Sequence, residues 1–150
     1  MLTETTALIR LGIGLVLGFA IGAERAFHKH PVGARTYMLI CIGSTLATLV
    51  SIYICQTNTN LLNGDPGRIA AQILTGIGFI GAGLILKTGS GVTGITTAAS
   101  IFATAVIGMA VGVGMIKTAA LVTLAVIAIL WSVSLVGKKD KKDSSSEEDR

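Results

Sequence analysis

Long stretches without a charged residue divide this chain. Four of them lie between successive charged positions, at residues 36–64, 69–86, 88–116 and 118–137. A helix that crosses a bilayer needs about 20 mostly apolar residues, with a range of about 17 to 25. Each stretch is therefore long enough for one membrane span, and none comfortably holds two. An earlier apolar segment, residues 7–23, is interrupted only by Arg10, which lies near one end and is expected to snorkel to the interface.

The composition agrees with a membrane protein and argues against the soluble classes. Only 13% of the 150 residues are charged, 51% are hydrophobic, and the mean hydropathy is +0.76. A soluble domain carries about 25% charged residues because its surface must stay solvated, and a disordered chain is richer still in charge. An aromatic content of 5% argues against a platform that stacks nucleic-acid bases. We therefore expect an all-α polytopic membrane helix bundle of about five transmembrane helices, with the lipid bilayer as its surroundings.

We predict a transmembrane domain over residues 1–137 and a charged, disordered cytoplasmic tail over residues 138–150. The first span is interpreted as a mature helix rather than a signal peptide, because no basic leader precedes it. An alternative topology has four spans, with the first segment lying in the membrane interface. The five predicted spans cover residues 7–23, 36–54, 68–86, 95–115 and 118–136.

The distribution of Lys and Arg predicts the orientation. With five spans and the N-terminus outside, the inner loops and the tail hold nine basic residues, and the outer side holds three. Cytoplasmic loops carry the excess of basic residues in membrane proteins. We therefore expect the N-terminus outside and the C-terminus in the cytoplasm. The juxtamembrane lysines of the tail account for much of the net charge of +4, so nucleic acid is not expected as a partner.

The 19 glycines predict close helix packing. Lipid tails are as apolar as leucine, so helices associate in membranes where small residues let their backbones approach. Faces lined with glycine also lead us to expect a homodimer. A second interpretation is that the glycine density in the third span marks a hinge or a narrow pathway. The glycines assigned to helix packing are Gly14, Gly18, Gly22, Gly76, Gly78, Gly81, Gly83, Gly108 and Gly112.

The sequence offers little for catalysis or for a cofactor. Two strings, at residues 76–81 and 89–94, spell G-x-G-x-x-G, but no acidic residue follows at the distance that a nucleotide site needs. Glu24, His28 and His30 lie close together in sequence, yet a solvated inner loop is favoured over a metal site. We therefore expect no enzyme activity, no cofactor and no metal.

Polar residues near the predicted helix ends form the candidate site. Ionisable residues at membrane depth usually pair or line a cavity, although they also simply mark interfaces. Glu24 is expected to pair with Arg25 or Arg35 on the inner side. Asp65 and Arg68 are expected to form a separate outer group, with Asp65 near a helix N-terminus where its charge is favourable. The glycine-rich inner turn at residues 87–94 is either an anion nest or a plain turn. The candidate residues are Glu24, Arg25, Arg35, Thr36, Asp65, Arg68, Gln72, Thr96 and Thr97.

Five strings in a fixed order carry a family resemblance. They are Gly18-x-x-x-Gly22-x-Glu24-Arg25, Gly33-Ala-Arg35-Thr36, Asp65-Pro-x-Arg68-Ile-Ala-Ala-Gln72 continuing through Thr75-Gly76-Ile-Gly78-Phe79-Ile-Gly81-Ala-Gly83, Val92-x-Gly94-Ile-Thr96-Thr97-Ala98-Ala99, and Gly108-x-Ala-x-Gly112-x-Gly114. With these strings, which span residues 18–114, the chain resembles the N-terminal membrane domain of the MgtC/SapB family.

This resemblance implies a bacterial inner-membrane protein linked to magnesium homeostasis and to virulence. It implies a regulator that acts on other membrane proteins, including the proton-driven ATP synthase. The alternative is a small transporter or channel for Mg²⁺ or another cation. Many members carry a folded, ACT-like cytoplasmic domain where this sequence has its charged tail, so properties of that domain are not carried over.

Overall fold

Five helices and one short β-hairpin make up the computed structural model, which describes residues 2–28, 30–57, 65, 67–88 and 91–147. Side-chain surroundings are described as far as Ser132, apart from Thr88. The elements in chain order are α1 (Glu4–Phe27), α2 (Ala34–Thr57), α3 (Gly67–Leu84), β1 (Leu86–Thr88), β2 (Gly91–Thr93), α4 (Ile95–Val113) and α5 (Ile116–Glu147).

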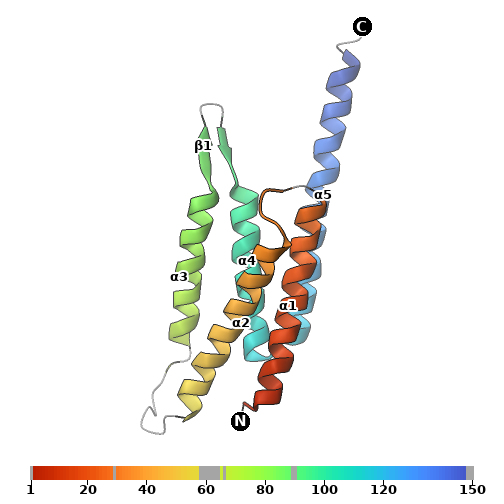
Figure 1. Ribbon diagram of the computed structural model, residues 1–150. Helices are drawn as coiled ribbons and strands as arrows, with labels where there is room; N and C mark the ends of the chain where they lie inside the picture. The colour runs from red at the N-terminus through yellow and green to blue at the C-terminus, as the bar shows by residue number, and fades with distance from the viewer. Residues whose placement is uncertain (1, 29, 58–64, 66, 89–90, 148–150) are drawn as a thin grey trace.

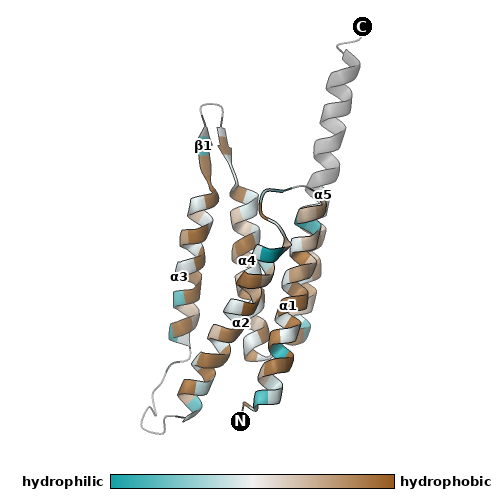
Figure 2. Cartoon of the chain, in the orientation of Figure 1, coloured by the Kyte–Doolittle hydropathy of each residue, from teal (hydrophilic) through white to brown (hydrophobic). Residues whose placement is uncertain are grey.

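The helices run up and down alternately, so the two chain ends lie at opposite ends of the bundle (Figure 1). The predicted all-α membrane bundle is confirmed. α1 to α4 are each long and apolar enough to cross a membrane, and α5 contributes a shorter apolar part, Ile116–Ser132. Apolar residues cover most of the helix surfaces in Figure 2. Because α1 packs along α2, the alternative that laid the first segment in the interface is not supported.

Three helices form the compact part of the bundle, and glycines set the distances between them. An added Cβ at Gly14 or Gly18 would lie 2.6 Å from Thr45 Oγ1 or 2.8 Å from Cys41 Cβ, so α1 and α2 are in backbone contact there. Gly108 and Gly112 of α4 approach the other side of α2 just as closely. Helices α1, α2 and α4 therefore interlock around a core to which each contributes fully buried side chains, among them Ile21, Tyr37, Cys41, Ile101, Ala105 and Val111.

α3 is packed more loosely than α1, α2 and α4. Only Ile77 and Gly81 are buried along its length. Gly81 lies in ordinary van der Waals contact with Ala98 of α4, whereas a Cβ added at Gly76, Gly78 or Gly83 would meet nothing within 4 Å. The glycines of this span therefore leave open surface rather than a filled contact.

The link between α3 and α4 is a β-hairpin, where the sequence predicted a helix to residue 86 and then a turn. β1 pairs antiparallel with β2, with Leu86 opposite Thr93. Gly94 then adopts a φ of +88°, and a side chain there would collide with the Leu84 carbonyl. A left-handed backbone in such close contact favours glycine, so Gly94 joins the hairpin directly to α4.

The end of the chain also differs from its prediction. α5 continues as a helix to Glu147, although the sequence predicted a disordered tail from residue 138. Lysine and glutamate are good helix formers, so a helix already started in the apolar part extends into the charged segment. Residues 148–150 lie outside the described part of the chain.

Candidate functional site

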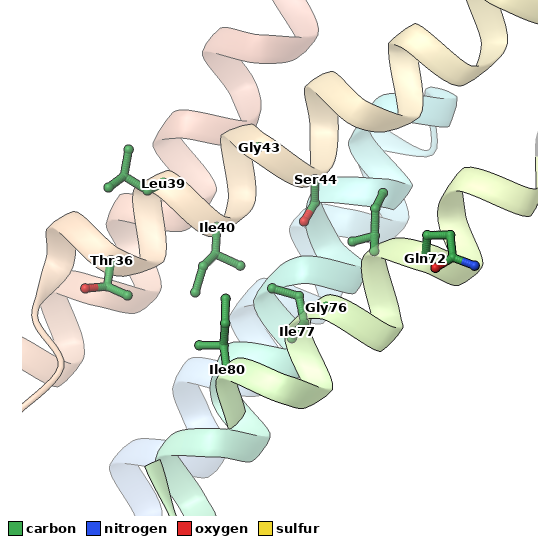
Figure 3. A pocket seen from close by; sticks show the side chains of 10 residues that line it. Thr36, Leu39, Ile40, Gly43, Ser44, Gln72, Gly76, Ile77 and Ile80 are labelled. Carbon is green, nitrogen blue, oxygen red and sulfur yellow. The ribbon is translucent and has the colours of Figure 1, made fainter. Parts of the chain in front are cut away.

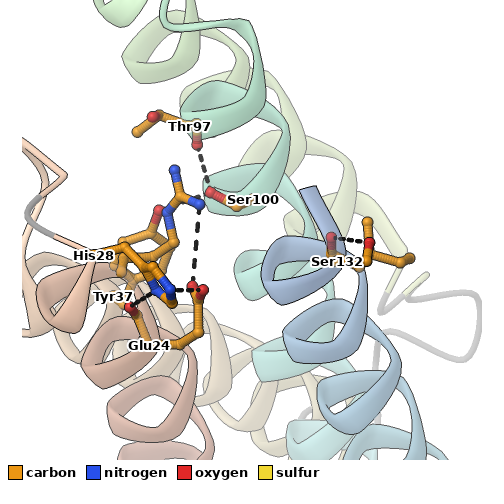
Figure 4. Close-up of polar contacts among 8 residues, drawn as sticks. Glu24, His28, Tyr37, Thr97, Ser100 and Ser132 are labelled. Carbon is orange, nitrogen blue, oxygen red and sulfur yellow. Dashed lines mark hydrogen bonds and ion pairs between the residues drawn. The ribbon is translucent and has the colours of Figure 1, made fainter. Parts of the chain in front are cut away.

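A charged cluster occupies the last turn of α1, at the end of the bundle where the β-hairpin lies. Glu24 Oε1 is 3.0 Å from His28 Nδ1, and Glu24 Oε2 is 4.0 Å from Arg25 Nη1 (Figure 4). His28 also contacts the Glu24 carbonyl oxygen through Nδ1, at 3.1 Å. Glu24 thus lies beside Arg25, as one of the two predicted pairings has it. Arg35, the other predicted partner, is exposed in the first turn of α2, and none of the ion pairs between described residues includes it.

Both charged side chains of this cluster are buried. The Arg25 side chain is 4% exposed and that of Glu24 is 8% exposed. Glu24 Oε1 has His28 Nδ1 as its partner at 3.0 Å, whereas Glu24 Oε2 has only the 4.0 Å ion pair, and Arg25 Nε lacks a hydrogen-bond partner among the described residues. Buried charged groups are costly unless they are paired and hydrogen-bonded. Arg25 therefore keeps hydrogen-bonding capacity that its neighbours in the bundle do not use.

Arg25 lines a cavity of about 640 Å³, which we call the hairpin-end cavity. The α1–α2 loop, the β-hairpin and the first turn of α4 form its walls. Thr96 and Thr97, both predicted site residues, line it together with Arg25. The remaining lining residues are His30, Pro31, Leu84, Leu86, Val92, Thr93, Gly94 and Ile95.

A buried chain of hydroxyl groups lies next to Arg25 and was not predicted. Ser100 donates a hydrogen bond to the Thr97 carbonyl at 2.8 Å, so Tyr37 must donate the 2.6 Å bond between its hydroxyl and Ser100 Oγ. This chain joins α2 to the first turns of α4 (Figure 4). Neither residue belongs to a recognisable motif, because a Tyr or Ser in an apolar helix is ordinary. Only the packing of α2 on α4 shows the pair.

His30 lies at the edge of the same cavity, outside the apolar spans. Partial burial lowers the pKa of His30 below its usual value of 6.5, and the positive charge of Arg25 lowers it further, against the opposing effect of Glu24. Within the described part of the chain, no group of three or more His, Cys, Asp or Glu side chains comes together as a metal site would require. Glu24 and His28 form a pair, without a third ligand of this kind.

Thr36 and Gln72 lie apart from this cluster, in a groove between α2 and α3 (Figure 3). The groove has a volume of about 430 Å³. Ser44 is its third polar side chain, and the other lining residues are apolar or glycine: Leu39, Ile40, Gly43, Ile73, Gly76, Ile77 and Ile80. The sequence analysis grouped these polar residues with Glu24 in one candidate site, but the structure places them on a different, lateral surface.

Asp65 and Arg68 lie at the opposite end of the bundle and do not pair with each other among the described ion pairs. Asp65 Oδ1 instead accepts a hydrogen bond of 2.7 Å from the Gly67 amide, at the start of α3. Acceptors of this kind satisfy the free amides of a helix N-terminus. Asp65 therefore interacts with the N-terminal end of α3, where a negative charge is favourable.

Arg10 also has a role that its position in the sequence did not show. It was expected to snorkel to the interface, but its Nη1 donates a 2.7 Å hydrogen bond to the Gly112 carbonyl at the C-terminal end of α4. Gly114 follows with a φ of +96°. A cation at a helix C-terminus is stabilised by the helix dipole and by unpaired carbonyls. Arg10 thus ties α1 to the end of α4.

Comparison with known proteins places the chain in a family. Residues 11–139 match the MgtC family. YhiD of Escherichia coli K12, whose name proposes a magnesium transporter, is 46% identical over 110 residues, which are 72% of this chain and 51% of that protein. MgtC of Brucella abortus is 40% identical over 76% of this chain and 45% of its own length, and SapB of Bacillus subtilis is 36% identical over 87% and 59%.

The chain thus spans about half the length of these relatives, and the match lies in their N-terminal region. No solved structure matches the chain significantly. The family match covers most of the 150 residues and includes at least part of every helix described above, and it confirms the resemblance carried by the five strings. This chain is a membrane protein of the MgtC family.

Proposed function

We propose that the chain is a multi-pass inner-membrane protein that regulates other membrane proteins without catalysing a reaction, in a process linked to magnesium. The observation that carries this proposal is the closed interior of the bundle. Fully buried side chains, such as Ile21, Ile101 and Val111, fill the space between the two polar ends. Glu24 and Arg68 lie at opposite ends of this filled core.

The polar groups inside the core are already bonded, which also supports a sealed bundle. Thr48, Thr104 and Thr123 donate to carbonyls four residues earlier in their own helices, each at 2.8 Å. Thr45 donates to both Cys41 and Gly108 carbonyls at 2.9 Å. The hydrogens of these hydroxyls are therefore used within the bundle, and the hydroxyls help to hold its helices together.

The link to magnesium comes from the relatives, since YhiD carries it in its name. The orientation with the N-terminus outside follows from the excess of basic residues on the other side. With that orientation, the hairpin-end cavity and the charged end of α5 face the cytoplasm. A regulator would meet soluble ligands and partner domains on this side.

A transporter is the second candidate, and the groove between α2 and α3 favours it. Gln72 and Ser44 are its central polar groups, and α3 has few buried contacts that would resist movement. Gln72 is already exposed, and movement of α3 would also expose Ser44 to a solute. The name of YhiD points the same way.

Flux measurements on purified protein separate the two candidates. We expect liposomes that contain the full chain to move Mg²⁺, H⁺ and K⁺ no faster than protein-free liposomes. The regulator proposal fails if flux is found and is abolished by Glu24→Gln or Gln72→Ala, but retained in the surface control Arg35→Gln. Chemical crosslinking in native membranes then tests for a captured membrane protein, which the regulator requires.

We still propose a homodimer, but we place its interface on a different helix from the one that the sequence predicted. Gly14, Gly18 and Gly22 of α1 are occupied by α2 of the same chain. The open helix surface is that of α3, where Gly78 has no neighbour and Phe79 is 84% exposed. We propose that a second copy packs on α3 rather than on α1.

A further inference from the structure

One wall of the hairpin-end cavity contains a buried cation, the Arg25 guanidinium, whose hydrogen-bond donors are not all used. Arg25 lines this cavity, and its side chain is 4% exposed. Its ion pair with Glu24 spans 4.0 Å, which is longer than a hydrogen bond. Its Nε has no hydrogen-bond partner among the described residues. A guanidinium has five N–H donors, and a buried donor without a partner is unfavourable, so this side chain is suited to a ligand that accepts hydrogen bonds.

The N-terminus of α4 opens into the same cavity. Its first residues, from Gly94 to Thr97, line the wall, and no side chain caps the helix. The first amides of a helix have no partner within the helix, and they form the positive end of its dipole. α4 is 19 residues long, so this dipole is fully developed. Anions bind at such helix ends.

The other charged groups near the cavity also favour a negatively charged ligand. No carboxylate occurs among the described residues that line it. Glu24 lies behind Arg25, beside His28, and is not part of the wall. The hydroxyls of Thr96 and Thr97 supply further donors. Among the described residues, the lining thus combines a cation and hydroxyl donors with apolar side chains, and it includes no acidic group.

We propose that the hairpin-end cavity binds a phosphate group, held by the Arg25 guanidinium and by the first-turn amides and hydroxyls of α4. Arginine forms paired hydrogen bonds with phosphate oxygens. The volume of about 640 Å³ also admits a phosphate carried on a larger molecule. The cavity lies where the apolar helices end, which is the level of lipid headgroups. This site does not depend on whether the chain regulates or transports.

Two measurements distinguish a free phosphate from a lipid headgroup. The full chain is purified in dodecyl maltoside, which carries no phosphate. In the first measurement, isothermal titration calorimetry follows the binding of added inorganic phosphate to this protein. In the second, native mass spectrometry counts the molecules of phosphatidylglycerol that each chain retains, with diacylglycerol as the matched lipid without phosphate. We expect one saturable site per chain for at least one of the two phosphate probes.

Variants test whether that site is the hairpin-end cavity. Arg25→Gln should weaken binding at least about tenfold, because it removes the charge and most of the donors. Arg35→Gln removes an exposed arginine at the same end of the bundle and should change affinity by less than about twofold. Thr97→Val keeps the side-chain shape and should weaken binding by about threefold or more.

The proposal is overturned if neither probe saturates, or if Arg25→Gln and Arg35→Gln weaken binding equally. It is also overturned if a folded Arg25→Gln binds as well as the unchanged chain. If Arg25→Gln does not fold, Thr97→Val becomes the deciding variant. Phosphate binding by Thr97→Val that equals binding by the unchanged chain would then contradict the proposal. Binding of phosphatidylglycerol alone assigns the cavity to a headgroup, and binding of inorganic phosphate assigns it to a free ion or phosphate ester.

Discussion

Helices α1 and α3 both carry dense glycines, but they use them in opposite ways. Gly14, Gly18 and Gly22 of α1 bring the backbone of α2 so close that an added Cβ would lie 2.5–2.8 Å from the nearest atom. Gly76 and Gly78 of α3 face open space. Glycine therefore brings α1 and α2 into close contact, whereas on α3 it leaves a surface that lipid or another protein can contact. Glycine density alone does not say which of the two occurs.

The largest effect is expected where glycine closes the contact between α1 and α2, and the test compares two glycines of α1. Gly18→Ala should lower the free energy of unfolding by about 1–3 kcal/mol, because the new methyl group collides with Cys41 Cβ and the Tyr37 carbonyl, both at 2.8 Å. Gly12→Ala is the matched control, since nothing lies within 4 Å of it. It should leave stability unchanged or raise it by up to about 1 kcal/mol. Equal losses in reversible unfolding from detergent would contradict the packing described above.

A substitution on α3 should change association rather than folding. Gly78→Leu places a large side chain on the proposed dimer surface and should shift the protein toward the monomer by at least about tenfold in dissociation constant. Light scattering of the protein in detergent measures this shift, and the melting temperature serves as the control for folding. A dimer that withstands Gly78→Leu would remove α3 from the interface.

Within the compact part, a single hydroxyl has a smaller effect. Tyr37→Phe breaks the 2.6 Å hydrogen bond to Ser100 and should cost about 1 kcal/mol of unfolding free energy. Tyr53→Phe removes the hydroxyl of an exposed tyrosine on the same helix and should cost little. If both substitutions have the same effect, the bond between α2 and α4 does not contribute to stability.

The smallest expected effect is a shift in the titration of His30. Burial and Arg25 hold the pKa of His30 below 6.5, so Arg25→Gln should raise it toward 6.5, whereas Arg68→Gln at the far end should leave it unchanged. Since the unfolded chain binds this proton more readily, His30 should make stability fall slightly as the pH drops below 6.5. Histidine signals in a pH series of NMR spectra measure both pKa values.

Much of the fold could be predicted because it depends on length and polarity. Charge-free stretches fixed the number of helices, since each must be long enough to cross a bilayer. The hairpin at Leu86–Thr93 could not be found, because three-residue strands have no periodic pattern to detect. Its cause is the contact of Gly94 with the Leu84 carbonyl, which exists only in the folded chain.

The sequence indicated which polar residues lie near helix ends, but it did not show which of them lie together. Glu24, Arg25, Thr96 and Thr97 were singled out as polar groups near helix ends, and the structure brings them to one end of the bundle. Asp65 and Arg68 were expected to form one outer group, with Asp65 near a helix N-terminus. Spacing cannot show that a nearby amide competes for the carboxylate, as that of Gly67 does.

The hydroxyl bonds inside single helices have a consequence for assembly in the membrane. Thr48, Thr104 and Thr123 find their partners one turn back in their own helix, so these bonds form before any helix meets another. Each segment can then enter the bilayer with its hydroxyls already satisfied. The bonds from Thr45 and Tyr37 to α4 form later, on docking, and they fix how far α2 and α4 slide along each other.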